Sequence, residues 1–176
     1  DLSNSSFKNT NIEGARFVYA NLDNSNLLDR IDRSNINLAG TDLSNVSLKG
    51  KDLSGTNLSY VDLSEHDLTD TNLSNSTLWR TNLSSIDLSS TTLINVVSRY
   101  ANLSESNLPD SLVNNNFDLA KLMNINFTGK DLSGSSFQRA ELDGSDMRNT
   151  NLFGASFIQV DFTKIKNESI AGADLS

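Results

Sequence analysis

Leucine recurs every five residues along much of this chain, and this spacing constrains the fold more than any other feature. From Leu43 to Leu93 a leucine stands at every fifth position without a miss. A period of five fits neither the 3.6 of an α-helix nor the 2 of a flat strand. It fits a four-sided coil with one pentad per side, in which every fifth residue points inward. Apolar residues continue the spacing on both sides, at Leu2, Phe7, Ile12, Phe17, Leu22, Leu27, Leu103, Leu108, Phe117, Leu122, Phe127, Leu132, Phe137, Leu142, Met147, Leu152, Phe157 and Phe162.

The neighbours of each central residue repeat as well. The residue before it is usually Asp or Asn, and the residue two before it is usually Ala, Ser, Thr or Val. Over nearly the whole chain this pattern closely resembles the pentapeptide-repeat family. The resemblance implies an all-β fold, a right-handed quadrilateral β-helix whose central residue and small residue face inward. Stacked at ~4.8 Å per coil, residues 1–176 form a single domain of about eight coils.

The register slips in three places. One extra residue falls between Leu27 and Leu38, one residue is missing between Leu108 and Leu112, and the spacing is lost after Phe162. We expect a bulge or small loop over 28–33 and further irregular turns at the other two places.

The hexapeptide GKDLSG occurs at 50–55 and again at 129–134. Frame counting places both copies on one face, four coils apart, with Lys51 and Lys130 at the inward-facing small position. Because burial of an unpaired ammonium is costly, each stem should lie along the wall with its amine at a corner or beside an Asp.

Residues twenty apart share a face of such a coil. Phe117, Phe137 and Phe157 should therefore stack as an internal aromatic column, whereas Phe153 faces outward. Most outward aromatic residues share one face with several arginines, which is a composition typical of binding hot spots. These rings could instead only cover their neighbours in the ladder. The candidate partner-binding residues are Tyr19, Tyr60, Trp79, Arg80, Arg99, Tyr100 and Arg139.

Composition argues against catalysis. The chain has no cysteine and a single histidine, His66, which stands at an inward-facing position and is interpreted as a half-buried structural residue. The Asp residues before central leucines recur with the repeat, so we expect them to bind corner amides rather than calcium. We therefore expect no catalytic residue, metal site or cofactor in this segment. The net charge of -8 predicts an acidic surface that does not bind nucleic acid directly, and no apolar run approaches the ~20 residues of a membrane span.

Two functions are consistent with these features. The first is a non-catalytic protein–protein interaction scaffold. It would be the partner-recognition module of a larger bacterial effector with a role in virulence, such as a HECT-like ubiquitin ligase whose catalytic domain lies elsewhere in the parent chain. Its partner would be another protein, such as a host protein, met in the bacterial cytoplasm or after secretion into the host cell.

The alternative function is an acidic DNA mimic that binds a type II topoisomerase and protects gyrase, as some members of the family do. Such a mimic would be a dimer. Leu rather than Phe at most central positions, the lack of Cys and the lack of a recognisable dimerising helix favour the scaffold.

Overall fold

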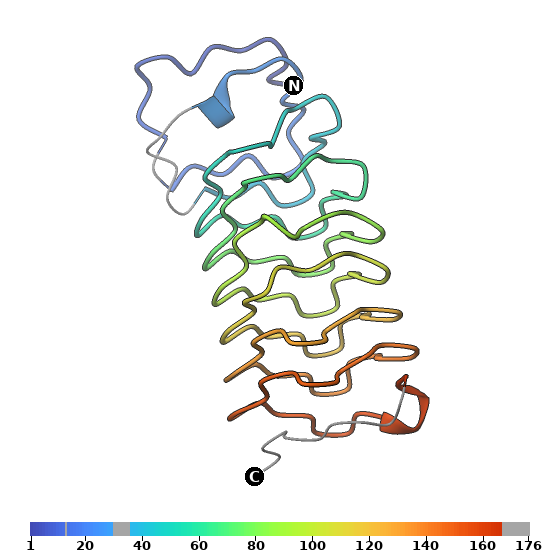
Figure 1. The fold of residues 1–176 in the computed structure, drawn as a ribbon. Coiled ribbons are helices and arrows are strands. Elements are labelled where there is room, and N and C mark those ends of the chain that lie inside the picture. The colour runs from blue at the N-terminus through green and yellow to red at the C-terminus, as the bar shows by residue number, and fades with distance from the viewer. Residues whose placement is uncertain (13, 30–35, 167–176) are drawn as a thin grey trace.

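The chain winds into stacked four-sided coils that follow one another from the N-terminal to the C-terminal end (Figure 1). The computed structural model describes residues 1–12, 14–29 and 36–166. Parallel bridges join residues twenty apart, as from Asp52 to Asn72 and from Asn72 to Thr92. This is the right-handed quadrilateral β-helix predicted from the period of five.

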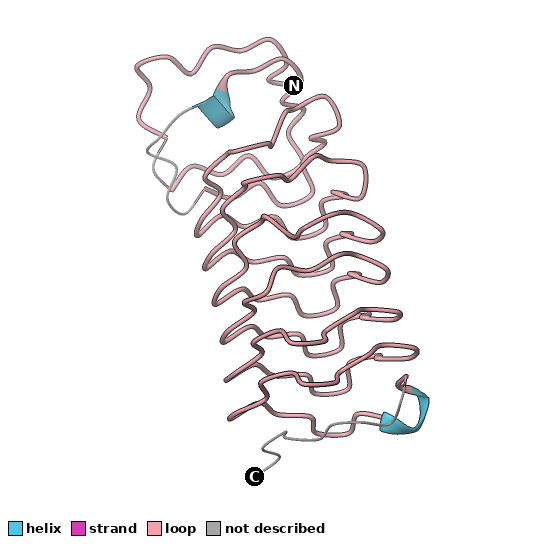
Figure 2. Ribbon diagram, in the orientation of Figure 1, coloured by secondary structure: helices cyan, strands magenta, loops and turns pink. Residues whose placement is uncertain are grey.

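The sides of the coil are too short for regular strands. Within the described residues the ladder consists of isolated bridges separated by turns, and the helices are two short 3-10 turns (Figure 2). These are η1 (Leu27–Asp29) and η2 (Phe162–Lys164), and both lie at predicted register slips. Most of the expected irregular segment 28–33 lies outside the described residues.

The bridges confirm two of the register slips. Arg16 pairs with Asn37, twenty-one residues on, which accounts for the extra residue after Leu27. Val97 pairs with Asn116, nineteen residues on, which accounts for the residue missing beside Pro109. The stack therefore stays in register because each irregular coil changes its length while the bridges around it persist.

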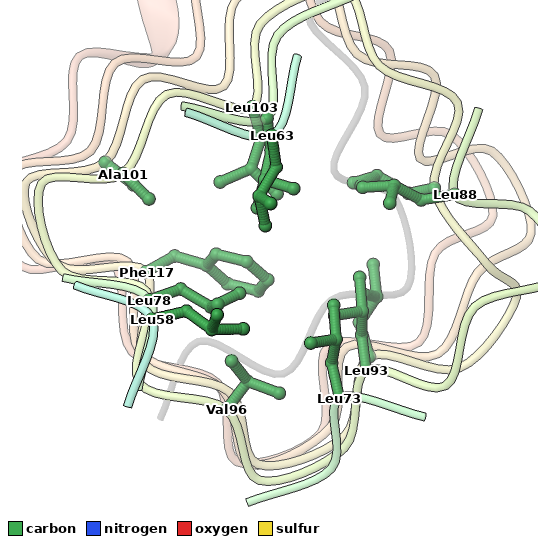
Figure 3. Close-up of a cluster of buried hydrophobic side chains, with 14 of the residues drawn as sticks. Leu58, Leu63, Leu73, Leu78, Leu88, Leu93, Val96, Ala101, Leu103 and Phe117 are labelled. Atoms are coloured by element: carbon green, nitrogen blue, oxygen red, sulfur yellow. The ribbon is translucent and has the colours of Figure 1, made fainter. Parts of the chain in front are cut away.

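Central residues from all four sides meet inside the coil (Figure 3). Leu58, Leu63, Leu78 and Leu88 have no exposed surface. The predicted phenylalanine column is confirmed. Phe117 and Phe137 stack with ring centroids 5.1 Å apart and an interplanar angle of 25°. The rings of Phe137 and Phe157 are 4.7 Å apart at 4°.

The small inward residue forms a second, internal ladder. At several of these positions a Ser or Thr hydroxyl donates a hydrogen bond to the carbonyl of a central residue in the preceding coil, and such bonds satisfy a buried acceptor that would otherwise be costly. They join Thr71 to Leu48 (2.9 Å), Thr81 to Leu58 (2.8 Å), Thr91 to Leu68 (3.0 Å), Ser135 to Leu112 (2.8 Å) and Thr150 to Phe127 (2.9 Å).

The lysines of the two GKDLSG segments contact the irregular coils that precede them. Lys130, itself 9% exposed, donates from Nζ to the Leu108 carbonyl at 2.7 Å and lies 3.4 Å from Asp110 in the shortened turn. Lys51 Nζ lies 2.5 Å from Asp29, the last residue of η1. The prediction that each amine lies beside an Asp is confirmed. Each lysine also reaches a coil of abnormal length.

The Asp residues before central leucines accept corner amides, as predicted. Asp42 Oδ1 accepts from the Ser44 amide at 3.0 Å, and the same bond recurs along the rod. This bond and the Ser44 hydroxyl lower the pKa of Asp42. The Thr69 hydroxyl, the Lys49 amine and the Thr69 amide together lower the pKa of Asp67 to about 2.

Side chains at these same positions also interact between neighbouring coils. At four bridged pairs the side-chain amide of an Asn donates a hydrogen bond to the carboxylate of the Asp one coil earlier. The pairs are Asn72 to Asp52, Asn82 to Asp62, Asn107 to Asp87 and Asn151 to Asp131. Where one acid stands directly below another, no bridge forms among the described residues: Asp42 with Asp62, Asp67 with Asp87, and Glu141 with Asp161. Like charges stacked in this way lack a donor and repel one another.

Candidate partner-binding face

One of the four faces gathers the predicted aromatic and arginine side chains. We call it the aromatic face, and it comprises pentads 15–19, 36–40, 56–60, 76–80, 96–100, 115–119, 135–139 and 155–159. Corner bonds stack these pentads directly: Tyr60 N–H donates to the Trp79 carbonyl at 2.9 Å, and Arg80 N–H to the Arg99 carbonyl at 3.1 Å. Tyr100 N–H continues the series in the next coil.

Three rings of this face are in direct contact. The Tyr60 and Trp79 centroids are 4.7 Å apart with an interplanar angle of 84°, and those of Trp79 and Tyr100 are 6.3 Å apart at 87°. Edge-to-face pairs of this kind add about 0.5–1.5 kcal/mol beyond area burial. Tyr60 and Tyr100 nevertheless remain 46% and 42% exposed. The rings therefore form a rigid row whose outer surface is still open to a partner.

Two arginines lie over these rings. The Arg80 guanidinium carbon lies 4.9 Å from the Trp79 centroid and 5.4 Å from that of Tyr100. The guanidinium carbon of Arg99 lies 5.9 Å from the Tyr100 centroid, and its Nε is 4.0 Å from Asp118. Such cation–π contacts hold the guanidinium groups in place. Five predicted residues thus form one contact cluster.

The two remaining predicted residues share the face without joining this cluster. The Tyr19 ring lies over Gly40, where an added Cβ would fall 2.2 Å from the Tyr19 Cε1 atom. Glycine at position 40 therefore makes room for the Tyr19 ring. Arg139 Nε donates to Gln159 Oε1 at 2.5 Å, further along the same face.

Most exposed apolar side chains of the described residues also lie here. Five of the six large hydrophobic residues with exposed side chains are on the aromatic face, and Phe153, at 69%, is on another face, as predicted. The five are Tyr19 (73%), Tyr60 (46%), Val97 (39%), Tyr100 (42%) and Ile158 (58%). Val97 was absent from the predicted set, although its place before a central residue, usually held by Asp or Asn, was a signal that could have identified it.

The backbone of this face is strained in a way that the other faces avoid. At most corners the second residue after the central residue has a φ near +60°, a conformation that favours Gly and Asn. Elsewhere in the described chain these corners carry Gly, Asn, Asp or Ser, with Glu105 as the exception. On the aromatic face one of the eight corners is Gly40, and the other seven are Tyr19, Tyr60, Arg80, Tyr100, Leu119, Arg139 and Gln159. Strain of this kind clusters at binding sites, where surface chemistry rather than stability decides the residue.

Replacing Arg139 by asparagine should therefore stabilise the protein. Arg139 has a φ of 56°, and relief of this conformation is expected to raise the free energy of unfolding by about 1 kcal/mol. Urea unfolding would measure the change. The reverse substitution at an exposed corner of the same geometry, Asn149→Arg, is the matched control and should destabilise by a similar amount. Equal stability of both variants and the wild type would refute strain at these corners.

A surface pocket of about 530 Å³ lies beside the aromatic face. Tyr60, His66, Asp42, Asp62 and Glu65 contribute to its lining. His66 is half-buried, as predicted, and burial lowers its pKa although the three carboxylates oppose that shift. The pocket opens where the ladder is interrupted.

The ladder is also interrupted beside His66. Its ring occupies a position that normally holds a small residue, and Asp67 next to it bridges neither neighbouring coil among the described residues. Replacing His66 by threonine should let Asp67 bridge Ser47 of the preceding coil and raise the free energy of unfolding by about 1 kcal/mol.

The pH dependence provides a check on the His66→Thr prediction. Since the folded-state pKa of His66 lies below the ordinary histidine value of 6.5, the wild type should lose stability as the pH falls from 6.5 through the folded pKa. His66→Thr should not show this loss. Thermal unfolding between pH 7 and pH 5 measures it, and parallel pH profiles for the two proteins would contradict the expected role of His66.

The described residues contain no group of three or more His, Cys, Asp or Glu side chains that could hold a metal ion. None of their helices is long and apolar enough to cross a membrane.

Comparison with known proteins supports the fold. A family model described as pentapeptide repeats matches in eight copies, over residues 1–27, 36–75, 67–110 and 131–166. No curated protein matches the chain. HetL from the cyanobacterium Nostoc sp. strain PCC 7120, a pentapeptide repeat protein involved in heterocyst differentiation regulation, is 26% identical with a TM-score of 0.50. That alignment covers 97% of this chain and 91% of HetL.

Two further solved structures are similar to the chain. Rfr23, a pentapeptide repeat protein from the cyanobacterium Cyanothece 51142, is 29% identical over 78% of this chain and 88% of its own, with a TM-score of 0.23. QnrB1, a plasmid-mediated fluoroquinolone resistance protein, is 16% identical over 99% of this chain and 86% of its own, with a TM-score of 0.42.

Proposed function

Since this chain belongs to the pentapeptide repeat family, which is typically non-catalytic, we propose that it is a protein-interaction scaffold whose aromatic face binds a partner protein. The observation that carries this proposal is the concentration of exposed apolar side chains on one face of four. Exposed apolar surface gathered in one place marks contact sites more often than scattered residues do.

Packing within the ladder does not account for this surface. A ring that served only to pack on the neighbouring coil should itself be largely buried. Tyr19 instead is 73% exposed, and the residue under its ring is Gly40, which has no side chain to cover. The strained corners support the same proposal, because Asn or Gly would serve the fold better at each of them. Tyr, Trp and Arg are also the residue types that supply most binding energy in interfaces.

The wider context of the scaffold is also a proposal. A place in a larger bacterial effector, and a host protein as partner, would suit a binding module without catalytic groups. None of the relatives described above is named as an effector.

A second candidate function, the topoisomerase-binding DNA mimic, is favoured by one observation. The chain carries a net charge of -8, and all but one of its carboxylate side chains lie outside the aromatic face. A mimic would bind through these acidic faces, as a dimer, and its activity would not need Tyr60 or Trp79. Protection of gyrase supercoiling by the intact chain, retained in variants of the aromatic face, would favour the mimic over the scaffold.

The double substitution Tyr60→Ala with Trp79→Ala tests the scaffold. Partner capture by the immobilised chain should weaken at least about tenfold, because loss of two adjacent hot-spot residues typically costs more than 1.4 kcal/mol. Phe153→Ala is the matched control, since it removes an exposed ring from a different face. If the double variant captured the partner as well as the wild type did, the aromatic face would not be the binding surface.

A further inference from the structure

The aromatic face differs in charge from the rest of the molecule. Its eight pentads contain four arginines and one aspartate, which gives a formal charge of +3. Since the whole chain carries -8, the residues outside this face together carry -11. The arginines are Arg16, Arg80, Arg99 and Arg139, and the aspartate is Asp118. A basic face on an acidic rod favours a partner of complementary charge and disfavours its binding elsewhere.

The arginines of this face are also poorly neutralised. Among the described residues, Arg80 and Arg139 have no carboxylate within ion-pair distance, and Arg99 is at the 4.0 Å limit from Asp118. By contrast Arg148, on another face, binds a carboxylate through two of its nitrogens. Guanidinium donors are therefore available on the aromatic face although acids outnumber bases in the chain.

The aromatic rings orient one of these guanidinium groups, that of Arg80. Arg80 lies over both Trp79 and Tyr100, and a guanidinium stacked by its face keeps its N–H edges free for a carboxylate. We propose that the partner presents an acidic, extended protein segment to the aromatic face, with its carboxylates paired to the arginines and its apolar side chains on the rings. This inference rests on the proposed function and names the chemistry of the partner.

The dimensions suit a short segment. From Tyr60 to Arg139 the face spans four coils, or ~19 Å, which corresponds to about six residues of extended chain at ~3.3 Å each. A single-stranded nucleic acid would also offer anions and stackable bases. However, the three rings pack edge to face against one another rather than as parallel slots, and a long polyanion would meet the −11 of the neighbouring faces.

The fluorescence of Trp79, the only tryptophan of the chain, provides the assay. The intact protein is titrated with three probes: a peptide of about ten residues in which glutamates alternate with leucine and phenylalanine, the same peptide with glutamine for glutamate, and oligothymidylate. The glutamate peptide should bind, and rising salt should weaken its binding. The variant Arg80→Gln with Arg99→Gln should weaken it at least about tenfold. The variant Lys121→Gln with Lys166→Gln, which removes two exposed charges from other faces, should not.

Each other outcome overturns the inference. Equal binding of the glutamate and glutamine peptides would remove the role of charge but leave the aromatic face as a protein-binding surface. Binding of oligothymidylate in preference to the peptide would identify a nucleic-acid surface instead. Failure of every probe to change Trp79 emission would reject the acidic segment, while partner capture by the Tyr60 and Trp79 variants would decide separately whether the proposed function stands.

Discussion

Replacing Phe137 by alanine is expected to lower the free energy of unfolding by about 3–5 kcal/mol. The side chain is fully buried and stacks between Phe117 and Phe157, so its removal leaves a cavity in the middle of the column. The neighbouring coils cannot collapse into that cavity without breaking the backbone bridges that fix their separation. Equilibrium unfolding in urea, followed by circular dichroism, measures the loss.

Phe153→Ala is the control for that measurement, because this ring is 69% exposed. Surface substitutions of this kind usually change stability by less than about 0.5 kcal/mol. Equal losses for the buried and the exposed phenylalanine would contradict the inward column as a source of stability.

Replacing Lys130 by methionine should cost about 1–3 kcal/mol. Methionine keeps the apolar stem along the wall but removes the amine that donates to the Leu108 carbonyl at 2.7 Å. No backbone amide of the described residues donates to that carbonyl, since the turn that follows is one residue short. Its buried oxygen would therefore lose its donor.

The exposed residue Lys121 offers the comparison for Lys130. Lys121→Met should leave the stability nearly unchanged, whereas Lys130→Met should lower the unfolding midpoint in urea. Wild-type stability of Lys130→Met would mean that the shortened coil does not depend on the lysine.

The period of five was sufficient to predict most of the fold. Spacing alone determines which residues face inward, so the stacked rings of Phe117, Phe137 and Phe157 could be placed by counting in twenties. The same counting placed Tyr60, Trp79 and Tyr100 on one face. The assignment of residues to faces stayed correct across the shortened coil at Pro109. A missing residue changes the sequence separation between stacked positions from twenty to nineteen but leaves the order of the four faces unchanged.

Counting could not predict interactions that depend on the length of a side chain or on its charge. The bond from Lys130 to Leu108 arises from a side chain that spans one coil. The interruption beside His66 depends on the size of the ring and on Asp67, which has an acid directly below it. The position of Arg80 over two rings depends on the side-chain rotamers of Arg80, Trp79 and Tyr100, which the five-residue spacing does not determine.

The strained corners link the fold to the proposed function. Asn or Gly at Tyr60, Arg80 and Tyr100 would relieve the backbone, so the bulky side chains at these positions must be explained by what they contact. Stability and partner binding are expected to respond in opposite directions at such corners. Arg139→Asn should therefore raise the unfolding midpoint while weakening partner binding.

The emission of Trp79 tests the central claim most directly, since this residue lies in the middle of the aromatic face and is the only tryptophan in the chain. The partner captured by the wild-type chain is titrated into the protein while Trp79 emission and its quenching by acrylamide are recorded. Binding through the aromatic face predicts a blue shift and protection from acrylamide that saturate together with complex formation. Complex formation with unchanged emission and quenching would place the partner on another face and contradict the claim.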